Sequence, residues 1–380
     1  MVRNAVPPRV NPDSAGRSHA CQIPCVDRGR SLGAVNLREQ ADLVLGGEFL
    51  SREQSRELFG SALQDGADQV ALADLLRGMA ERSESVDEII GAAEALRGAM
   101  IPFVHADEDS SEGSGPVDTC GTGGDGLGSF NLSTAAALVA ASAGAKVIKH
   151  GNRSVSSKCG SADLLETAGV KLELDPAQAR TVYEEVGMVF LFAPAFHPSM
   201  RFVAPVRKQL GIRTIFNYLG PLCSPGSVKR QLLGVGVGDK LDDYAKVMIG
   251  LGAERAYVVH GAGGADELTL EGPNRVLCVG DVPAPKFDAS DLGLPASPVS
   301  ALEGGDARVN FRMLTAVLDG ADGPVRNAVL QNSCATLVVA GVCDTPASAL
   351  VAASAALDSG ATKSLLERLV EVSQKIGGDA

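Results

Sequence analysis

The stretch CGTGGDGLGSFNLSTAAALVAASAGAKVIK, residues 120–149, joins a glycine-rich loop to an alanine-rich run and a short apolar run. The run Thr134–Ala143 predicts a helix, and the run Lys146–Lys149 predicts a strand. Four glycines within residues 121–126 let backbone N–H groups converge on an anion, and the helix that follows adds the positive end of its dipole. The stretch therefore predicts an α/β fold with a phosphate- or pyrophosphate-binding loop. The alternative is a purely structural turn.

The alternation of helix and strand continues toward the C-terminus. Helical patterns and short apolar patterns succeed one another at Pro176–Val186, Met188–Phe192, Leu232–Gly236, Leu241–Leu251 and Ala256–His260. Strands separated by helices favour a mostly parallel central sheet. We therefore predict an α/β catalytic domain over residues 117–324, with further helices over 325–380 that pack on this domain or on the preceding one.

A different pattern precedes the α/β segment. Ser51 with Gln54, and Ser85 with Glu88, have the spacing of capping boxes that begin helices. We therefore predict a small helical domain over residues 36–100, followed by a polar linker. Residues 1–35 are rich in Pro, Arg and Ser without periodicity, which predicts a disordered N-terminal extension.

Charge and hydropathy limit the classes of function. The chain has 34 Lys and Arg against 46 Asp and Glu, a net charge of −12, which disfavours binding to nucleic acid or to an anionic membrane. No apolar run reaches the roughly 20 residues of a membrane span, and the N-terminus lacks the pattern of a secretory signal. None of the eight cysteines has CxxC spacing. We expect a cytoplasmic protein with reduced thiols.

Several polar segments could carry chemistry. Asn131, Ser133 and Thr134 follow the glycine-rich loop with amide and hydroxyl groups suited to an anion. Residues 149–157 (KHGNRSVSS) follow a predicted strand, at the edge where open α/β sheets bind ligands. Lys149 and Arg153 add cations there, although a solvated basic loop would have the same composition. Ser161 is predicted to cap the next helix.

Two further segments suggest a metal and a carboxylate. Asp266 and Glu267 follow a strand and a glycine-rich loop, and adjacent carboxylates of this kind suit Mg²⁺, although acidic pairs are also common in solvated turns. The segment His197–Gly211 is predicted to be a helix with Arg207 near its end. An arginine fork could bind a substrate carboxylate, whereas the ordinary alternative is a charge that stabilises a helix C-terminus.

Taken in order, the segments GTGGD, NLST, KHGNRSVSS, CGSADLLE, FLFAPAFHPSM, PVRKQLGIRTIFN, LGPL and ADEL resemble the anthranilate phosphoribosyltransferase family, from Asn36 to the C-terminus. The resemblance implies a small N-terminal helical domain plus an α/β domain, the fold shared with pyrimidine nucleoside phosphorylases. It also implies a homodimer formed through the helical domain. The implied reaction moves the phosphoribosyl group of 5-phosphoribosyl 1-pyrophosphate onto the amine of anthranilate with two Mg²⁺ ions, in tryptophan biosynthesis.

The resemblance also implies a role for individual residues. The implied contacts to the phosphoribosyl donor are Gly121, Gly124, Asp125, Ser129, Asn131, Ser133, Thr134, Lys149, His150, Gly151, Asn152, Arg153, Ser156, Ser157 and Ser161. The implied contacts to anthranilate are Gly121, Asn152 and Arg207, with His150 and the Gly220–Pro221 turn as walls. The implied metal ligands are Ser133, Asp266 and Glu267. His150 and Arg207 would position substrates, and no acid–base residue is expected, because the amine of anthranilate is already neutral at pH 7.

Three features depart from the family pattern. Residues 1–35 have no counterpart, Cys223-Ser224 replaces the more usual Thr-Asn, and Gln331-Asn332-Ser333 lies in a helix that is usually more apolar. Two other functions fit the same fold. A nucleoside phosphorylase would cleave thymidine or uridine, but the contiguous KHGNR and the acidic pair disfavour it. A non-enzymatic nucleic-acid-binding relative would need a basic groove, which this acidic chain does not suggest.

Overall fold

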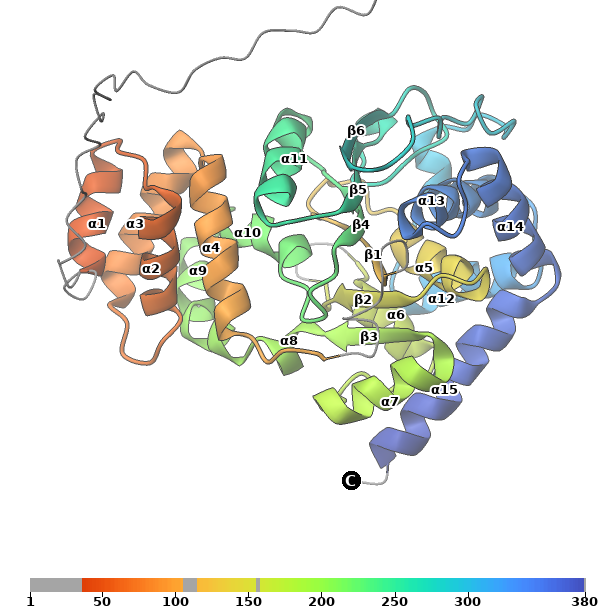
Figure 1. Cartoon of the computed structure of the whole chain (residues 1–380), viewed down its shortest axis with the longest axis horizontal. Coiled ribbons are helices and arrows are strands. Elements are labelled where there is room, and N and C mark those ends of the chain that lie inside the picture. The colour runs from red at the N-terminus through yellow and green to blue at the C-terminus, as the bar shows by residue number, and fades with distance from the viewer. Residues whose placement is uncertain (1–35, 105–114, 155–157, 379–380) are drawn as a thin grey trace, which may run out of the picture. The chain divides into compact units, whose positions relative to one another are not determined.

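The computed structural model describes residues 36–104, 115–154 and 158–378; the predicted extension 1–35, most of the linker, Ser156 and Ser157 lie outside them. Four helices come first: α1 (Leu37–Leu45), α2 (Arg52–Ala62), α3 (Gln69–Arg82) and α4 (Val86–Ala99) (Figure 1). Both predicted capping boxes are confirmed, since Ser51 and Ser85 each accept a hydrogen bond from the backbone N–H three residues later. The N-terminal helical region is therefore locally specified.

A six-stranded sheet forms the rest of the architecture, in the order β3-β2-β1-β4-β5-β6. The strands are β1 (Val117–Gly121), β2 (Val147–Gly151), β3 (Met188–Phe192), β4 (Arg230–Gly234), β5 (Arg255–His260) and β6 (Arg275–Gly280). All neighbouring pairs are parallel except β5 and β6, which are antiparallel. The predicted mostly parallel α/β fold is confirmed.

Eleven more α-helices lie between and after the strands in the described residues. They are α5 (Leu132–Ser142), α6 (Ser161–Thr167), α7 (Pro176–Val186), α8 (Ala193–Phe196), α9 (Ala204–Leu210), α10 (Phe216–Leu219), α11 (Leu241–Gly250), α12 (Ala307–Leu318), α13 (Pro324–Ala340), α14 (Pro346–Asp358) and α15 (Ala361–Gly378). Helix α13 packs on α5, β1, β4 and β5, and α15 packs on α7 and α5 (Figure 1). The C-terminal helices therefore cover the α/β region.

Both faces of the sheet are buried, as expected for parallel strands. Along β4 and β5, Leu232 and Tyr257 belong to one apolar core, and Leu233 and Val258 to a second one. The first core includes residues of α5, α7 and α13. The second includes α11 and all four N-terminal helices, and α11 contacts α4 directly. Alternate residues of each strand thus face the two cores, in keeping with the period of two.

Three local predictions differ from the structure. The segment His197–Gly211 is not one helix: a 3-10 helix spans Pro198–Phe202 and α9 begins only at Ala204, because Pro198 and Pro205 donate no backbone hydrogen bond. Ser161 is the first residue of α6 and not its cap; Gly160 precedes the helix and donates its N–H to Asp163. Strand β2 extends to Gly151, so Lys149 and His150 lie inside a strand.

Candidate active site

The candidate site lies where the order of the strands reverses. The chain runs from β1 to β2 and β3 on one side and then returns to place β4 and β5 on the other side of β1. In open parallel sheets, ligands bind outside the carboxyl ends of the strands at such a switch point. The glycine-rich loop follows β1, the KHGNR segment ends β2, and the acidic pair follows β5. Three predicted segments therefore meet at one edge.

Hydrogen bonds join the glycine-rich loop to the acidic pair. The backbone N–H of Gly123 donates to the carboxylate of Asp266 at 2.6 Å. The side chain of Asp266 also lies against the backbone of Gly121, where an added Cβ would overlap its carboxylate. Gly121 is thus required by close approach, and the loop and the Asp266 carboxylate form one unit.

The second carboxylate is bound to the start of α5. The backbone N–H of Ser133 donates to Glu267 Oε1 at 2.8 Å, so this carboxylate lies at a helix N-terminus. Beneath it, the side chain of Lys149 is buried, and its Nζ lies 2.5 Å from the carbonyl of Thr119 and 3.4 Å from Ser133 Oγ. The ammonium of Lys149 thus contacts both the end of β1 and the first turn of α5, and its contact with the donor stays a prediction.

The acidic cluster has the electrostatics of a cation site. Burial and then the charge of Asp125 raise the pKa of Asp266, and burial and then the charge of Asp266 raise the pKa of Glu267. In the described part of the chain, no three His, Cys, Asp or Glu side chains are grouped so as to hold a metal by themselves. Two carboxylates and the Ser133 hydroxyl nevertheless fit Mg²⁺, which usually takes few protein ligands and completes its shell with water and substrate oxygens.

At the end of β2, two histidines lie side by side. The rings of His150 and His197 have centroids 5.1 Å apart, and both side chains are buried. Burial lowers the pKa of His150 to about 3, with a smaller contribution from His197, and burial lowers the pKa of His197 to about 4. The carbonyl of Gly220 faces His150, which places the Gly220–Pro221 turn beside it. A neutral imidazole with so low a pKa is a poor proton acceptor, so this pair suits substrate positioning.

Arg207 is a half-buried cation without a carboxylate partner. Its guanidinium lies 5.5 Å from the ring centroid of Phe216, and burial lowers its pKa. None of the ion pairs between described residues includes Arg207. A partly desolvated arginine gains most from a bidentate anion, so Arg207 is suited to a substrate carboxylate.

Other predicted residues are already engaged within the protein. Asn131 accepts from Asn310 Nδ2 at 2.8 Å and donates to the carbonyl of Cys159 at 3.1 Å. Arg153 pairs with Glu166. Thr134 is fully buried. Ser161 lies against Gly151, and the Oγ of Ser161 is 3.5 Å from the carbonyl of Asn152. Among these, Asn131 and Ser161 connect neighbouring loops of the site.

The remaining predicted residues lie on the loops at the same edge. Gly124 has a φ of 75°, and an added Cβ there would overlap the guanidinium of Arg213. Asp125 Oδ1 accepts a hydrogen bond from the backbone N–H of Leu127 at 3.2 Å. Ser129 forms an isolated β-bridge with Glu303. The exposed Asn152 accepts a hydrogen bond from the N–H of Arg153 at 2.8 Å.

Sequence reasoning did not nominate His197, Arg213 or Asn332, which the structure places beside these segments. Arg213 lies against the glycine-rich loop, His197 against His150, and Asn332 against the backbone that follows Glu267. Each makes its contact across many residues of sequence. His197 and Arg213 could have been nominated from the FHP and IRT segments, which belong to the stretches that carry the family resemblance.

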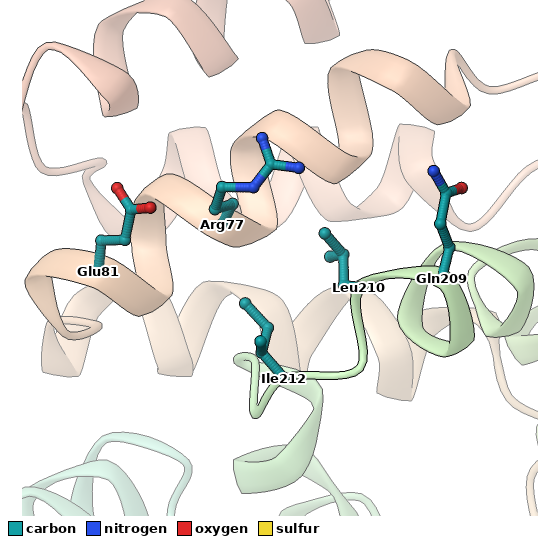
Figure 2. A pocket seen from close by; sticks show the side chains of 5 residues that line it. All are labelled: Arg77, Glu81, Gln209, Leu210 and Ile212. Atoms are coloured by element: carbon teal, nitrogen blue, oxygen red, sulfur yellow. The ribbon is translucent and has the colours of Figure 1, made fainter.

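A surface pocket lies elsewhere. It is lined by Arg77 and Glu81 of α3 and by Gln209, Leu210 and Ile212 at the end of α9 (Figure 2). None of the candidate donor, acceptor or metal residues lines it. It is therefore not an extension of the site at the sheet edge.

Asp118 on β1 is a buried carboxylate outside the proposed chemistry. Both of its oxygens are buried and lack a well-aligned hydrogen-bond donor. Burial raises its pKa to about 6, despite the charge of Lys149 and the nearby backbone N–H groups of His150 and Thr119. A raised folded pKa means that stability is fully present below the unfolded pKa and is lost as the pH rises through about 6. Between about pH 4 and pH 7 the loss is up to about 3 kcal/mol.

We therefore expect the free energy of unfolding of Asp118→Asn to increase relative to that of the parent between pH 4 and pH 8. Urea unfolding of both proteins at several pH values measures this. Asp281→Asn, at an exposed carboxylate, serves as the control for removing one acidic group. If the difference in unfolding free energy between Asp118→Asn and the parent were constant from pH 4 to pH 8, ionisation of Asp118 would not destabilise the fold.

Comparison with known proteins places this arrangement in a family. Residues 114–363 match the model of the glycosyl transferase family, a/b domain. The anthranilate phosphoribosyltransferase of Moorella thermoacetica is 43% identical over 338 residues, covering 88% of this chain and 97% of that protein. The same enzyme of a Roseiflexus species (strain RS-1) is 44% identical over 347 residues, covering 90% and 99%.

Solved structures agree with the sequence relatives. The crystal structure of anthranilate phosphoribosyltransferase from Thermus thermophilus has a TM-score of 0.81 at 40% identity, covering 88% of this chain and 99% of that one. The Saccharomyces cerevisiae enzyme in complex with its phosphoribosyl donor and Mg has the same fold, with a TM-score of 0.78 at 24% identity over 89% and 98% of the two chains. The chain therefore belongs to the anthranilate phosphoribosyltransferase family.

Proposed function

We propose that this chain transfers the phosphoribosyl group of 5-phosphoribosyl 1-pyrophosphate to the amine of anthranilate. The observation that carries the proposal is the pair of hydrogen bonds that connect the glycine-rich loop and the start of α5 to Asp266 and Glu267. They bring the glycine-rich loop, which suits an anion, and the acidic pair, which suits a cation, together at the switch point of the sheet. A diphosphate with bound Mg²⁺ suits both groups, because the diphosphate suits the glycine-rich loop and the cation suits the acidic pair.

The reaction needs little proton chemistry from the protein. The bond from ribose C1 to the pyrophosphate oxygen breaks, the amine nitrogen forms the new bond to C1, and its extra proton passes to solvent. The charge that needs stabilising develops on the leaving pyrophosphate. We assign its stabilisation to the backbone N–H groups of residues 124–126, since the N–H of Thr122 donates to the carbonyl of Gly234 and that of Gly123 donates to Asp266. Bound Mg²⁺ supplies the remaining neutralisation, and we assign two ions to Ser133, Asp266 and Glu267.

The acceptor contacts are assigned to a second set of residues. Arg207 binds the carboxylate of anthranilate, Asn152 and Gly121 orient its amine, and His150 with the Gly220–Pro221 turn forms a wall. The low pKa of His150 supports a neutral contact surface over a base. Positioning the amine near C1 then supplies most of the acceptor-side rate enhancement.

We assign the chain a homodimeric state through the helical region. Large apolar side chains are exposed there, including Phe49 at 57% and Val70 at 65%, together with Leu43 and Leu45. Helices α1 and α3, which carry Leu43, Leu45 and Val70, pack on each other. Exposed apolar groups on two packed helices suit an interface, although others, such as Ile249 and Val351, are exposed elsewhere. Light scattering should give twice the mass of 39.0 kDa, and Val70→Asp should shift it toward one chain.

Mass spectrometry of the reaction products tests the assigned reaction. With both substrates and Mg²⁺, the product should have the mass of anthranilate plus one phosphoribosyl group, and one pyrophosphate should appear for each product. Phosphorolysis of thymidine or uridine, without this product, would contradict the proposal and favour the nucleoside phosphorylase alternative.

A further inference from the structure

Helix α13 contains two buried amide side chains that the reaction does not use. Asn332 is 2% exposed and Gln331 is fully buried. Buried amides are costly unless each N–H and C=O finds a partner, so their partners indicate what they do. Both sets of partners include the segment that directly follows the acidic pair.

Asn332 pairs with the backbone of Leu268 in both directions. Its Oδ1 accepts from the N–H of Leu268 at 3.1 Å, and its Nδ2 donates to the carbonyl of Leu268 at 2.9 Å. Nδ2 also donates to the carbonyl of Ala328 at 2.9 Å, one turn earlier in the same helix. The amide is thus held at both ends and fixes the backbone immediately after Glu267.

Gln331 extends the same attachment. Its Nε2 donates to the carbonyl of Thr269 at 3.0 Å and to the carbonyl of Phe287 at 2.7 Å. Together the two side chains fix residues 268 and 269 to α13. They belong to the QNS segment that departs from an apolar helix pattern, and the departure has a structural use.

The same helix also packs on α5, whose first turn donates the Ser133 N–H to Glu267. Helix α13 is therefore connected to both groups that must hold a metal: to Glu267 through Leu268, and to Ser133 through α5. The Asn332 amide has partners for both its oxygen and its nitrogen, so shifting it would leave several polar groups unpaired, whereas Gln331 Oε1 has no partner among the described residues.

We propose that Asn332 is a positioning residue for the Mg²⁺ site. By holding the backbone of Leu268, it sets the position of Asp266 and Glu267 relative to the start of α5. It touches neither substrate nor metal. The proposal rests on the proposed Mg²⁺-dependent function of that site. Outer residues that orient metal ligands usually change metal affinity by about 10- to 100-fold when removed.

The test measures Mg²⁺ affinity without turnover. The thermal stabilisation of the full chain by the phosphoribosyl donor is followed while Mg²⁺ is titrated, for the parent, for Asn332→Leu and for Ser333→Ala. Leucine keeps the size of asparagine and removes its three hydrogen bonds. Ser333 is the matched control, since it is buried in the same helix and, among the described residues, its hydroxyl bonds to the carbonyl of Val329 alone.

We expect the Mg²⁺ midpoint of Asn332→Leu to rise by about tenfold or more, and that of Ser333→Ala to stay within about twofold of the parent. At saturating Mg²⁺ the KM for anthranilate should not change in Asn332→Leu. A folded Asn332→Leu with the parent's Mg²⁺ midpoint would overturn the proposal.

If Asn332→Leu does not fold, Asn332→Ala decides on the same criteria, because it removes the same three hydrogen bonds and adds no charge. A parent protein that binds the donor equally well with and without Mg²⁺ would overturn the proposed metal site itself. That result differs from loss of the Asn332 effect in a Mg²⁺-dependent parent, so the two failures are distinguishable.

Discussion

Replacing Glu267 by Gln should lower kcat/KM by at least about 100-fold, without lowering the melting temperature. The carboxylate is buried beside Asp266, and its charge is unfavourable until a cation binds. Gln keeps the size and can still accept the hydrogen bond from Ser133, but it removes the charge that binds Mg²⁺. Activity and stability should therefore change independently, as steady-state kinetics and thermal unfolding in the absence of substrates would show.

The matched control is Glu271→Gln. Glu271 is an exposed carboxylate four residues further along, and it accepts the backbone N–H of Val299 at 2.7 Å. This variant should keep the parent's activity. If Glu267→Gln retained activity, or lost it only through unfolding, Glu267 would not be a metal ligand.

Replacing Arg207 by Ala should raise the KM for anthranilate by about 10- to 100-fold and lower kcat much less. The guanidinium is half-buried, stacks near Phe216 and has no carboxylate partner in the part of the chain described. Its loss removes a charge-assisted contact to the substrate carboxylate and leaves no carboxylate of the described residues unpaired. The KM for the phosphoribosyl donor should stay close to that of the parent.

Lys208→Ala tests whether this effect is specific. Lys208 is the next residue of the same helix and is exposed, so removing its charge changes the net charge equally but not the pocket. An unchanged anthranilate KM in Arg207→Ala, or an equal rise in Lys208→Ala, would exclude Arg207 as the carboxylate-binding residue.

Local patterns predicted the parts of this fold that depend on local physics. The capping boxes at Ser51 and Ser85 and the strand Met188–Phe192 follow from spacing and apolar composition alone. Strand β1 (VDTCG) was not predicted, because Asp118 and Thr119 make it read as polar, although both are buried. The break between Phe202 and Ala204 was not predicted, although Pro198 and Pro205 are local signals for it.

In the candidate site, too, local segments could be predicted from the sequence, whereas contacts between distant residues could not. The glycine-rich loop, KHGNR and the acidic pair were recognised as separate segments, and the parallel sheet explains why they meet. Contacts over long sequence separations could not be predicted: Ser133 and Glu267 are 134 residues apart, and Leu268 and Asn332 are 64 apart. Nor does sequence show that Lys149 and Thr134 point into the protein, because burial depends on the packing of α5.

The central claim is most directly tested by following anthranilate fluorescence with time in the presence of the phosphoribosyl donor and Mg²⁺, and then with each omitted in turn. The structure predicts a loss of fluorescence that needs both, because the glycine-rich loop and the acidic pair form one site. Undiminished anthranilate in the complete mixture, with the protein folded, would contradict the account.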